Sequence, residues 1–193
     1  MQGFGNNKLP KKKKSQKKID DLFEAKMINK ALKFHAEGNI SEAVRSYEYC
    51  ISKGLNDYRI FTNYGLLLKD LGKLKEAEIF LRKAIEINPN FASAYSNLAS
   101  IFRILGKLKE AEIFLRKAIE IDPDFAMAYS NMGNVLKELG KFEEAEIFLR
   151  KAIKLNPKLS VAYFNLGNII KDLGKLEEAE IFLRKAIKLN PKL

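Results

Sequence analysis

The sequence lacks tryptophan and has one cysteine, one histidine, five prolines and eleven glycines among 193 residues. The lone cysteine, Cys50, excludes an intrachain disulfide and suits a reducing compartment. Few prolines and glycines favour helices. No apolar run approaches the roughly 18 residues of a membrane span. The amino-terminal MQGFGNNKLPKKKK has no apolar segment behind its charges, so it is not typical of a secretory signal. We therefore expect a soluble, cytoplasmic protein.

The residues of catalytic chemistry are equally scarce. His35 is the only histidine, and it has no cysteine or metal-ligand cluster near it in the sequence. Cys50 takes a place that alanine holds elsewhere, which predicts a small buried core residue. No glycine-rich phosphate-binding loop occurs. We expect no catalytic residue, no metal site and no cofactor, and hence a protein that is not an enzyme.

The positive charge is concentrated at the amino terminus. The chain carries 35 basic and 24 acidic residues, and residues 1–18 hold seven of the lysines and no acid. Their composition predicts a disordered lysine-rich tail, because it offers too little apolar area to offset the entropy of ordering. The tail would serve as a solubilising segment, or would contact nucleic acid or an anionic membrane.

What the sequence does have is repetition. The decamer EAEIFLRKAI occurs at 76–85, 110–119, 144–153 and 178–187, always 34 residues apart. Identical copies are a poor way to build one catalytic centre, which needs unlike groups, but a good way to build a uniform surface. A fixed period of this size indicates a stack of repeated helical units.

The unit at 126–159 shows the local structure most clearly. Apolar residues follow each other at three- and four-residue steps through Leu139, and again from Phe142 onward, which predicts two helices. Gly140 is suited to end the first helix, and Asn156-Pro157 to end the second. The same frame predicts a divergent first unit and four near-identical ones. These units span 19–57, 58–91, 92–125, 126–159 and 160–193.

This pattern resembles the tetratricopeptide repeat over about 170 of the 193 residues. An aromatic stands at the fourth place of the four close copies and glycine or alanine at the eighth. Alanine stands at the twentieth and twenty-seventh places, and proline at the thirty-second. The resemblance implies an all-α fold, a right-handed superhelix of helical hairpins, which binds other proteins or peptides in its concave groove.

The groove of this family is lined by the first helix of each unit, and its sixth place is asparagine in four units. The ladder resembles that of protein O-GlcNAc transferases, which implies that it grips a peptide backbone. Two further asparagines lie three residues along, and an amide both donates and accepts hydrogen bonds. Alternatively, these side chains bond to neighbouring backbone and only stabilise stacking. The set is Asn63, Asn97, Asn131 and Asn165, with Asn134 and Asn168.

Basic residues occupy the twelfth place of the same helices: Lys69, Arg103, Lys137 and Lys171. They would favour an acidic peptide. Three of them are followed directly by an acid, however, and this pattern is also typical of a solvated face of mixed charge.

One feature departs from the family. The residue after the twentieth-place alanine is glutamate and the next is isoleucine, as in Glu78-Ile79, where the family commonly has the reverse order. Each isoleucine either shields the hairpin seam beside the phenylalanine that follows it or is exposed as part of a contact patch.

The last helix carries an apolar face at Leu183, Ala186 and Ile187, where repeat arrays generally need a polar cap. This face predicts either a longer protein or end-to-end self-association. Three hypotheses result. The chain is a non-catalytic scaffold that binds polypeptide in its groove, the substrate-recognition part of a larger transferase resembling O-GlcNAc transferases, or a self-assembling module.

Overall fold

The computed structural model describes residues 11–192, with side chains from residue 22 onward, and this part of the chain consists of helices joined by short turns. The all-α prediction is confirmed. The helices are α1 (Lys11–Ala36), α2 (Ile40–Ser52), α3 (Tyr58–Asp70), α4 (Leu74–Ile87), α5 (Ala92–Ile104), α6 (Leu108–Ile121), α7 (Ala126–Glu138), α8 (Phe142–Leu155), α9 (Ser160–Asp172) and α10 (Leu176–Leu189). None of the helices within this range is both long and apolar enough to cross a bilayer.

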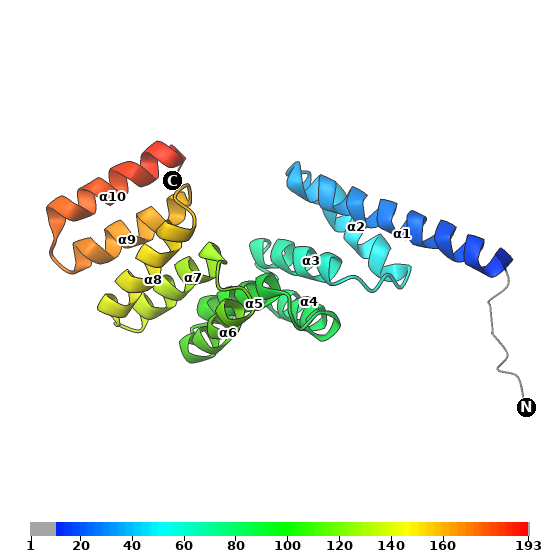
Figure 1. The fold of residues 1–193 in the computed structure, drawn as a ribbon, viewed down its shortest axis with the longest axis horizontal. Helices are drawn as coiled ribbons and strands as arrows, with labels where there is room; N and C mark the ends of the chain where they lie inside the picture. Colours follow the sequence, from blue (N-terminus) through cyan, green and yellow to red (C-terminus); the bar gives the residue numbers. More distant parts are fainter. Residues whose placement is uncertain (1–10, 193) are drawn as a thin grey trace, which may run out of the picture.

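Consecutive helices pair as hairpins, and the hairpins stack into a curved arc (Figure 1). Each second helix also packs against the first helix of the next hairpin, so that one core runs through the stack. From α3 onward the first helices lie toward the inside of the arc and the second helices toward the outside (Figure 1). The molecule is therefore a solenoid with an inner and an outer face.

Both predicted helix stops of the third close unit are confirmed. Gly140 has a φ of +76°, and the N–H of Lys141 donates to the C=O of Leu136 at 2.9 Å, which closes the end of α7. This left-handed angle is one that a residue with a Cβ adopts only at a cost. α8 ends at Leu155, and Asn156 is extended, as the proline after it requires.

Small residues lie where two helices of one hairpin approach each other. A Cβ added to Gly133 would come within 2.5 Å of Cγ of Leu149, which packs across the hairpin from α8. Ala145 and Ala152 on the same side of α8 are fully buried. The repeated small residues thus set the distance between the paired helices, and the leucine fills the space that they leave.

The first hairpin keeps this plan despite its different sequence. Gly38 has a φ of +72°, and Ala43 and Tyr47 are fully buried, at the places where the close copies have glycine, alanine and leucine. Tyr64 on α3 donates to the carboxylate of Glu48 on α2 at 3.0 Å. Burial and this hydrogen bond raise the pKa of Tyr64 to about 12. The divergent unit is joined to the stack by this bond as well as by the core.

The structure differs from the sequence prediction at the amino-terminal tail. α1 begins at Lys11, so residues 11–18 are helical here, although we expected disorder through residue 18. Lysine and glutamine are good helix formers, and no proline or glycine interrupts the chain between Lys11 and Ala36, so this composition is compatible with one continuous helix. Residues 1–10 lie outside the described range, and the predicted contacts of the tail with nucleic acid or membrane stay predictions.

Candidate peptide-binding face

The sixth-place asparagines lie on successive inner helices. α3, α5, α7 and α9 each carry one, and each side chain is half-buried. Asn134 and Asn168 are also half-buried, about one helical turn further along α7 and α9. The four helices that carry the sixth-place asparagines follow one another along the inside of the arc (Figure 1), and the binding role of these amides stays a prediction.

The amide nitrogens of two of these asparagines bond within the protein. Nδ2 of Asn63 donates to the backbone C=O of Arg59 at 2.9 Å. Nδ2 of Asn131 donates to Oγ of Ser96 on the preceding unit at 3.0 Å. The predicted stacking role thus applies to Asn131 through its nitrogen. Among the described residues, no side-chain or backbone donor bonds to the Oδ1 atom of a sixth-place asparagine.

The asparagines lie next to a row of hydroxyl groups that the sequence analysis did not single out. Thr62, Ser96 and Ser130 stand at the fifth place, and their exposed fractions are only 4%, 2% and 1%. Oγ of Ser130 and Nδ2 of Asn165 are both buried and have no hydrogen-bond partner among the described residues. These two residues stand at the same places as the bonded pair Ser96 and Asn131. The signal that could have found the row is a hydroxyl residue 35 positions before each of three asparagines.

The basic residues of the twelfth place form ion pairs. Lys69 contacts Asp70 at 3.2 Å. Arg103 contacts Glu138 of the next unit at 2.5 Å, and Lys137 contacts Asp172 of the next unit at 2.9 Å. Lys171 is exposed. Because three of the four cations already have a carboxylate, the inner face has a mixed charge and offers little net attraction to an acidic peptide.

Apolar side chains are exposed on the inner helices toward the carboxyl end. Phe164 is 39% exposed at the fifth place, where three other units have a buried hydroxyl residue. Met127, on α7, is also 39% exposed. α7 packs directly against α9, which carries Phe164. The inner face therefore changes from polar near α3 to partly apolar near α9.

At the start of α3, Asp57 and Arg59 form an ion pair at 2.7 Å. The carboxylate of Asp57 also accepts the backbone N–H of Arg59 at 2.8 Å, which caps the helix. Burial alone would raise the pKa of Asp57, but the hydrogen bonds and charge of Arg59 outweigh it and lower that pKa below its ordinary value. Arg59 is thus engaged within the protein.

The lone histidine and cysteine have structural environments. Nδ1 of His35 is 3.0 Å from the hydroxyl of Tyr47, across the first hairpin. Cys50 is fully buried, as predicted, and burial raises the pKa of its thiol. No group of three or more histidine, cysteine, aspartate or glutamate side chains in the described range is placed to hold a metal ion.

The face formed by α9 and α10 combines buried and exposed apolar groups. Ala186 is fully buried and Leu183 is half-buried, whereas Ile187 is 56% exposed. Leu176 beside them is 66% exposed, and together with Leu183 and Ile187 it lines a groove of about 370 Å³. Of the three predicted contact residues, Ile187 is thus the most accessible.

The seam-shielding interpretation of the repeated isoleucines is wrong. Their exposed fractions are 64% to 67%, while the phenylalanines that follow them are half-buried. The phenylalanine alone covers the seam, because the helix turns the preceding residue outward. The exposed residues are Ile79, Ile113, Ile147 and Ile181.

These features define the class of the protein, a solenoid of stacked helical hairpins with a continuous core. The family model of the tetratricopeptide repeat matches residues 59–124, 90–158 and 124–192, and the chain belongs to this family. A search of curated protein sequences finds no match to this chain.

Solved structures of the same fold extend the comparison. TTC0263, a thermophilic tetratricopeptide-repeat protein of Thermus thermophilus, is similar with a TM-score of 0.77 at 21% identity, over 88% of this chain and 92% of that one. PilF of Pseudomonas aeruginosa has a TM-score of 0.76 at 16% identity, over 88% and 78%. MamA from Desulfovibrio magneticus RS-1 has a TM-score of 0.67 at 21% identity, over 88% and 96%. At such identities the likeness concerns the fold.

Proposed function

We propose that this protein is a non-catalytic scaffold that binds an extended polypeptide along the inner face of its arc. Tetratricopeptide repeats generally bind other proteins, and the chain belongs to that family. The observation that carries the proposal is the row of half-buried asparagines on α3, α5, α7 and α9. One amide per unit matches a ligand that repeats its own polar groups, as a peptide backbone does.

The internal hydrogen bonds determine what the row offers to a ligand. One N–H of Nδ2 in Asn63 and in Asn131 is engaged inside the protein, so the atom of either amide that has no partner in the protein is the oxygen. A row of oxygen acceptors selects for donors, and the N–H groups of an extended peptide recur along its length. The likeness of this ladder to that of O-GlcNAc transferases stays a prediction from the sequence.

The asparagines alone bind weakly. One neutral hydrogen bond contributes roughly 0.5–1.5 kcal/mol net, against an association cost of roughly 4–15 kcal/mol. Apolar contacts must supply the rest, and Phe164 and Met127 are the exposed apolar groups beside the row. We therefore expect a preference for peptides with a large apolar side chain near the part that contacts α7 and α9.

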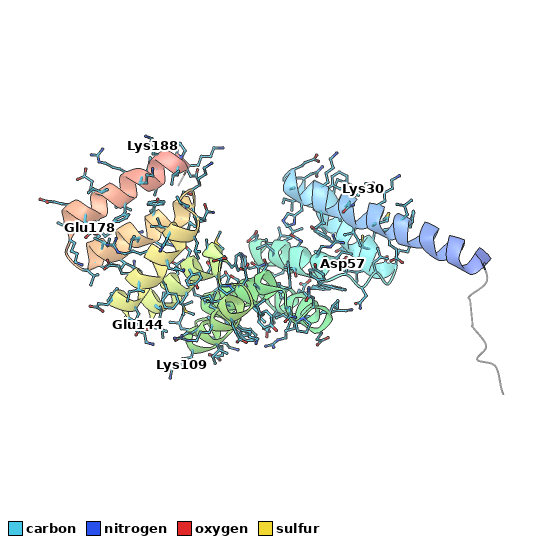
Figure 2. All side chains as sticks on the ribbon, in the orientation of Figure 1. Lys30, Asp57, Lys109, Glu144, Glu178 and Lys188 are labelled. Atoms are coloured by element: carbon cyan, nitrogen blue, oxygen red, sulfur yellow. The ribbon has the colours of Figure 1, made fainter. Side chains whose placement is uncertain are left out.

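The test is peptide binding by fluorescence anisotropy. The probe is an uncharged, labelled peptide of about 16 residues made of serine, threonine and valine with one phenylalanine, which spans about 50 Å when extended. The double variant Asn97→Ala, Asn165→Ala removes two acceptors and no internal hydrogen bond. Each of its two substitutions should weaken binding of the peptide about 2- to 10-fold. Glu144→Ala on the outer helix α8 is the matched control (Figure 2). Equal affinity of the double variant and the control would refute the proposal.

End-to-end association is a second candidate function, favoured by the exposed apolar face of α9 and α10. Leu176 and Ile187 are 66% and 56% exposed there. If this face joins two chains, Leu176→Glu with Ile187→Glu keeps the mass at 22.0 kDa at concentrations where the unchanged protein is heavier. Light scattering measures this, and an unchanged concentration dependence in the variant would exclude the face.

A role as the substrate-recognition part of a larger transferase stays a prediction. A sugar-nucleotide-binding domain encoded in the same reading frame would support it. The peptide probe bears on it as well, because a transferase of that kind requires a groove that holds polypeptide.

A further inference from the structure

The outer face carries a regular row of exposed apolar side chains. Ile79, Ile113, Ile147 and Ile181 stand at the same place of α4, α6, α8 and α10, and each is exposed by about two thirds. The helices that carry them lie along the outer edge of the arc, where Figure 2 labels Lys109, Glu144 and Glu178 of α6, α8 and α10. Solvent-exposed isoleucine is unfavourable, so the repetition requires a reason.

Neither helix formation nor internal packing supplies that reason. Isoleucine has a lower helix propensity than leucine, lysine or glutamate, and its exposed side chain adds little to the core. The charged residues beside each isoleucine do stabilise their own helix. An arginine and a glutamate form an ion pair within each outer helix, as Arg82 does with Glu78 at 2.8 Å. These i,i+4 pairs stabilise the helix by a few tenths of a kcal/mol. The isoleucine forms no such pair, and about two thirds of its side chain lies outside the core.

The outer helices are also more uniform than packing demands. α4 and α6 are identical over 14 residues, whereas the inner helices α3 and α5 share one residue of 13. The exposed isoleucine, arginine and lysine are the same in all four units. Simple duplication would have kept the inner helices equally alike. The uniform outer face therefore fits a partner that repeats with the same period.

We infer that the isoleucine row is a docking surface for a second copy of this chain. A second copy carries the same row, and because the outer side of the arc is convex (Figure 1), the two copies would meet at the middle of the row, where α6 and α8 carry Ile113 and Ile147. Two copies related by a two-fold axis present the same patch to each other, so the patch must be self-complementary.

The charges around each isoleucine meet this condition. In α8, Glu143 and Glu144 stand four and three residues before Ile147, and Arg150 and Lys151 stand three and four residues after it. When outer helices of two copies pack antiparallel, as a two-fold axis across them requires, the acidic half of each lies beside the basic half of the other. Isoleucine then meets isoleucine at the centre of the contact, with complementary charges on both sides.

The same charges disfavour a membrane as the partner. Each of the four outer helices carries three basic and three acidic residues. A surface without net positive charge gains nothing from the negative potential of anionic lipid.

The test is sedimentation equilibrium of the full chain up to about 0.5 mM. We expect the apparent mass to rise from 22.0 kDa toward twice that value. Ile113→Glu with Ile147→Glu should weaken the association at least tenfold. Leu22→Glu with Leu71→Glu, at residues of α1 and of the turn after α3 that are 72% and 51% exposed, is the control that adds the same charge and should leave it unchanged.

Because the two isoleucines are about two-thirds exposed, their replacement should not alter folding, which circular dichroism and thermal melting verify. A mass that stays at 22.0 kDa at every concentration would overturn the inference. So would an association that Leu176→Glu with Ile187→Glu abolishes and the isoleucine pair does not, since this result would assign the contact to the face of α9 and α10. Neither result depends on whether the inner face binds peptide.

Discussion

A pair of hydrogen-bonding side chains between units shows how much a single residue decides in this stack. Asn131 reaches back to Ser96 at 3.0 Å, and both residues have equivalents in the next pair of units. There, Oγ of Ser130 and Nδ2 of Asn165 are buried but unpaired among the described residues. A buried polar group without a partner is destabilising, whereas a satisfied one is mildly stabilising. The same sequence motif thus has two different energetic consequences.

This difference predicts that replacing serine by alanine changes the free energy of unfolding by different amounts at Ser96 and at Ser130. Ser96→Ala leaves Nδ2 of Asn131 without its acceptor and should lower the free energy of unfolding by about 1 kcal/mol. Ser130→Ala removes an unpaired buried hydroxyl and should change it by less than about 0.5 kcal/mol, or raise it. Urea unfolding of the two variants compares them directly. If both lose the same free energy, Ser130 and Asn165 form the bond in solution.

At the scale of the helix, α3 is the one helix among α2–α10 whose N-cap side chain accepts a backbone N–H. The side chain of Asp57 accepts the N–H of Arg59 and also forms an ion pair with that residue. The lowered pKa of Asp57 means that the folded protein favours its charged form. The stabilisation is therefore present above the pKa of about 3.9 of an unfolded aspartate, and is lost as the pH falls through the lower folded value.

Asp57→Ala should accordingly lower the free energy of unfolding by about 1 kcal/mol at pH 7. The deficit should shrink as the pH is lowered below about 4, because the unchanged protein then loses its charge too. Urea titrations at pH 7 and pH 3 measure both values. Glu76→Ala is the control, since this exposed carboxylate makes only a 3.8 Å contact with Lys73 and should cost under about 0.5 kcal/mol. A deficit for Asp57→Ala that does not depend on pH would contradict the role of the charge.

Some helix ends in this protein can be predicted from the sequence and others cannot. The ends of α7 and α8 follow from Gly140 and Asn156-Pro157 because glycine and proline act on the backbone locally. The start of α1 does not, since the lysine-rich segment is compatible with either helix or coil. The orientation of the Asn131 side-chain amide cannot be predicted from the sequence either, because it depends on a hydrogen bond to Ser96, a residue of another unit.

Exposure of the isoleucine row is a similar case. The reversed order in Glu78-Ile79 showed that this unit departs from its family, but two places for the side chain remained open. Only the position of Phe80 against the seam decides between them, and that position depends on how the paired helices pack. The period of the repeat therefore predicts the helices and their order, whereas contacts between helices determine which side chains are exposed.

At the scale of the whole molecule, the helices that vary from unit to unit and the helices that are nearly constant lie on different sides of the arc. Its inner helices differ from unit to unit and carry the asparagines, the ion pairs and Phe164. Its outer helices are nearly the same in every unit. A selective ligand requires the varied face and a repeated partner suits the uniform one. On the two proposals above, one molecule holds a polypeptide on one side and a second copy on the other.

The measurement that addresses this account most directly compares two forms of one peptide on the inner face. The first is the uncharged phenylalanine-containing probe, and the second is the same peptide with its backbone nitrogens methylated in the central segment. Methylation removes the N–H donors and leaves the side chains unchanged. If the asparagine oxygens accept those N–H groups, methylation should weaken binding at least tenfold, and Asn97→Ala with Asn165→Ala should reduce that difference. If both peptides bind with the same affinity, the asparagine row does not recognise the peptide backbone.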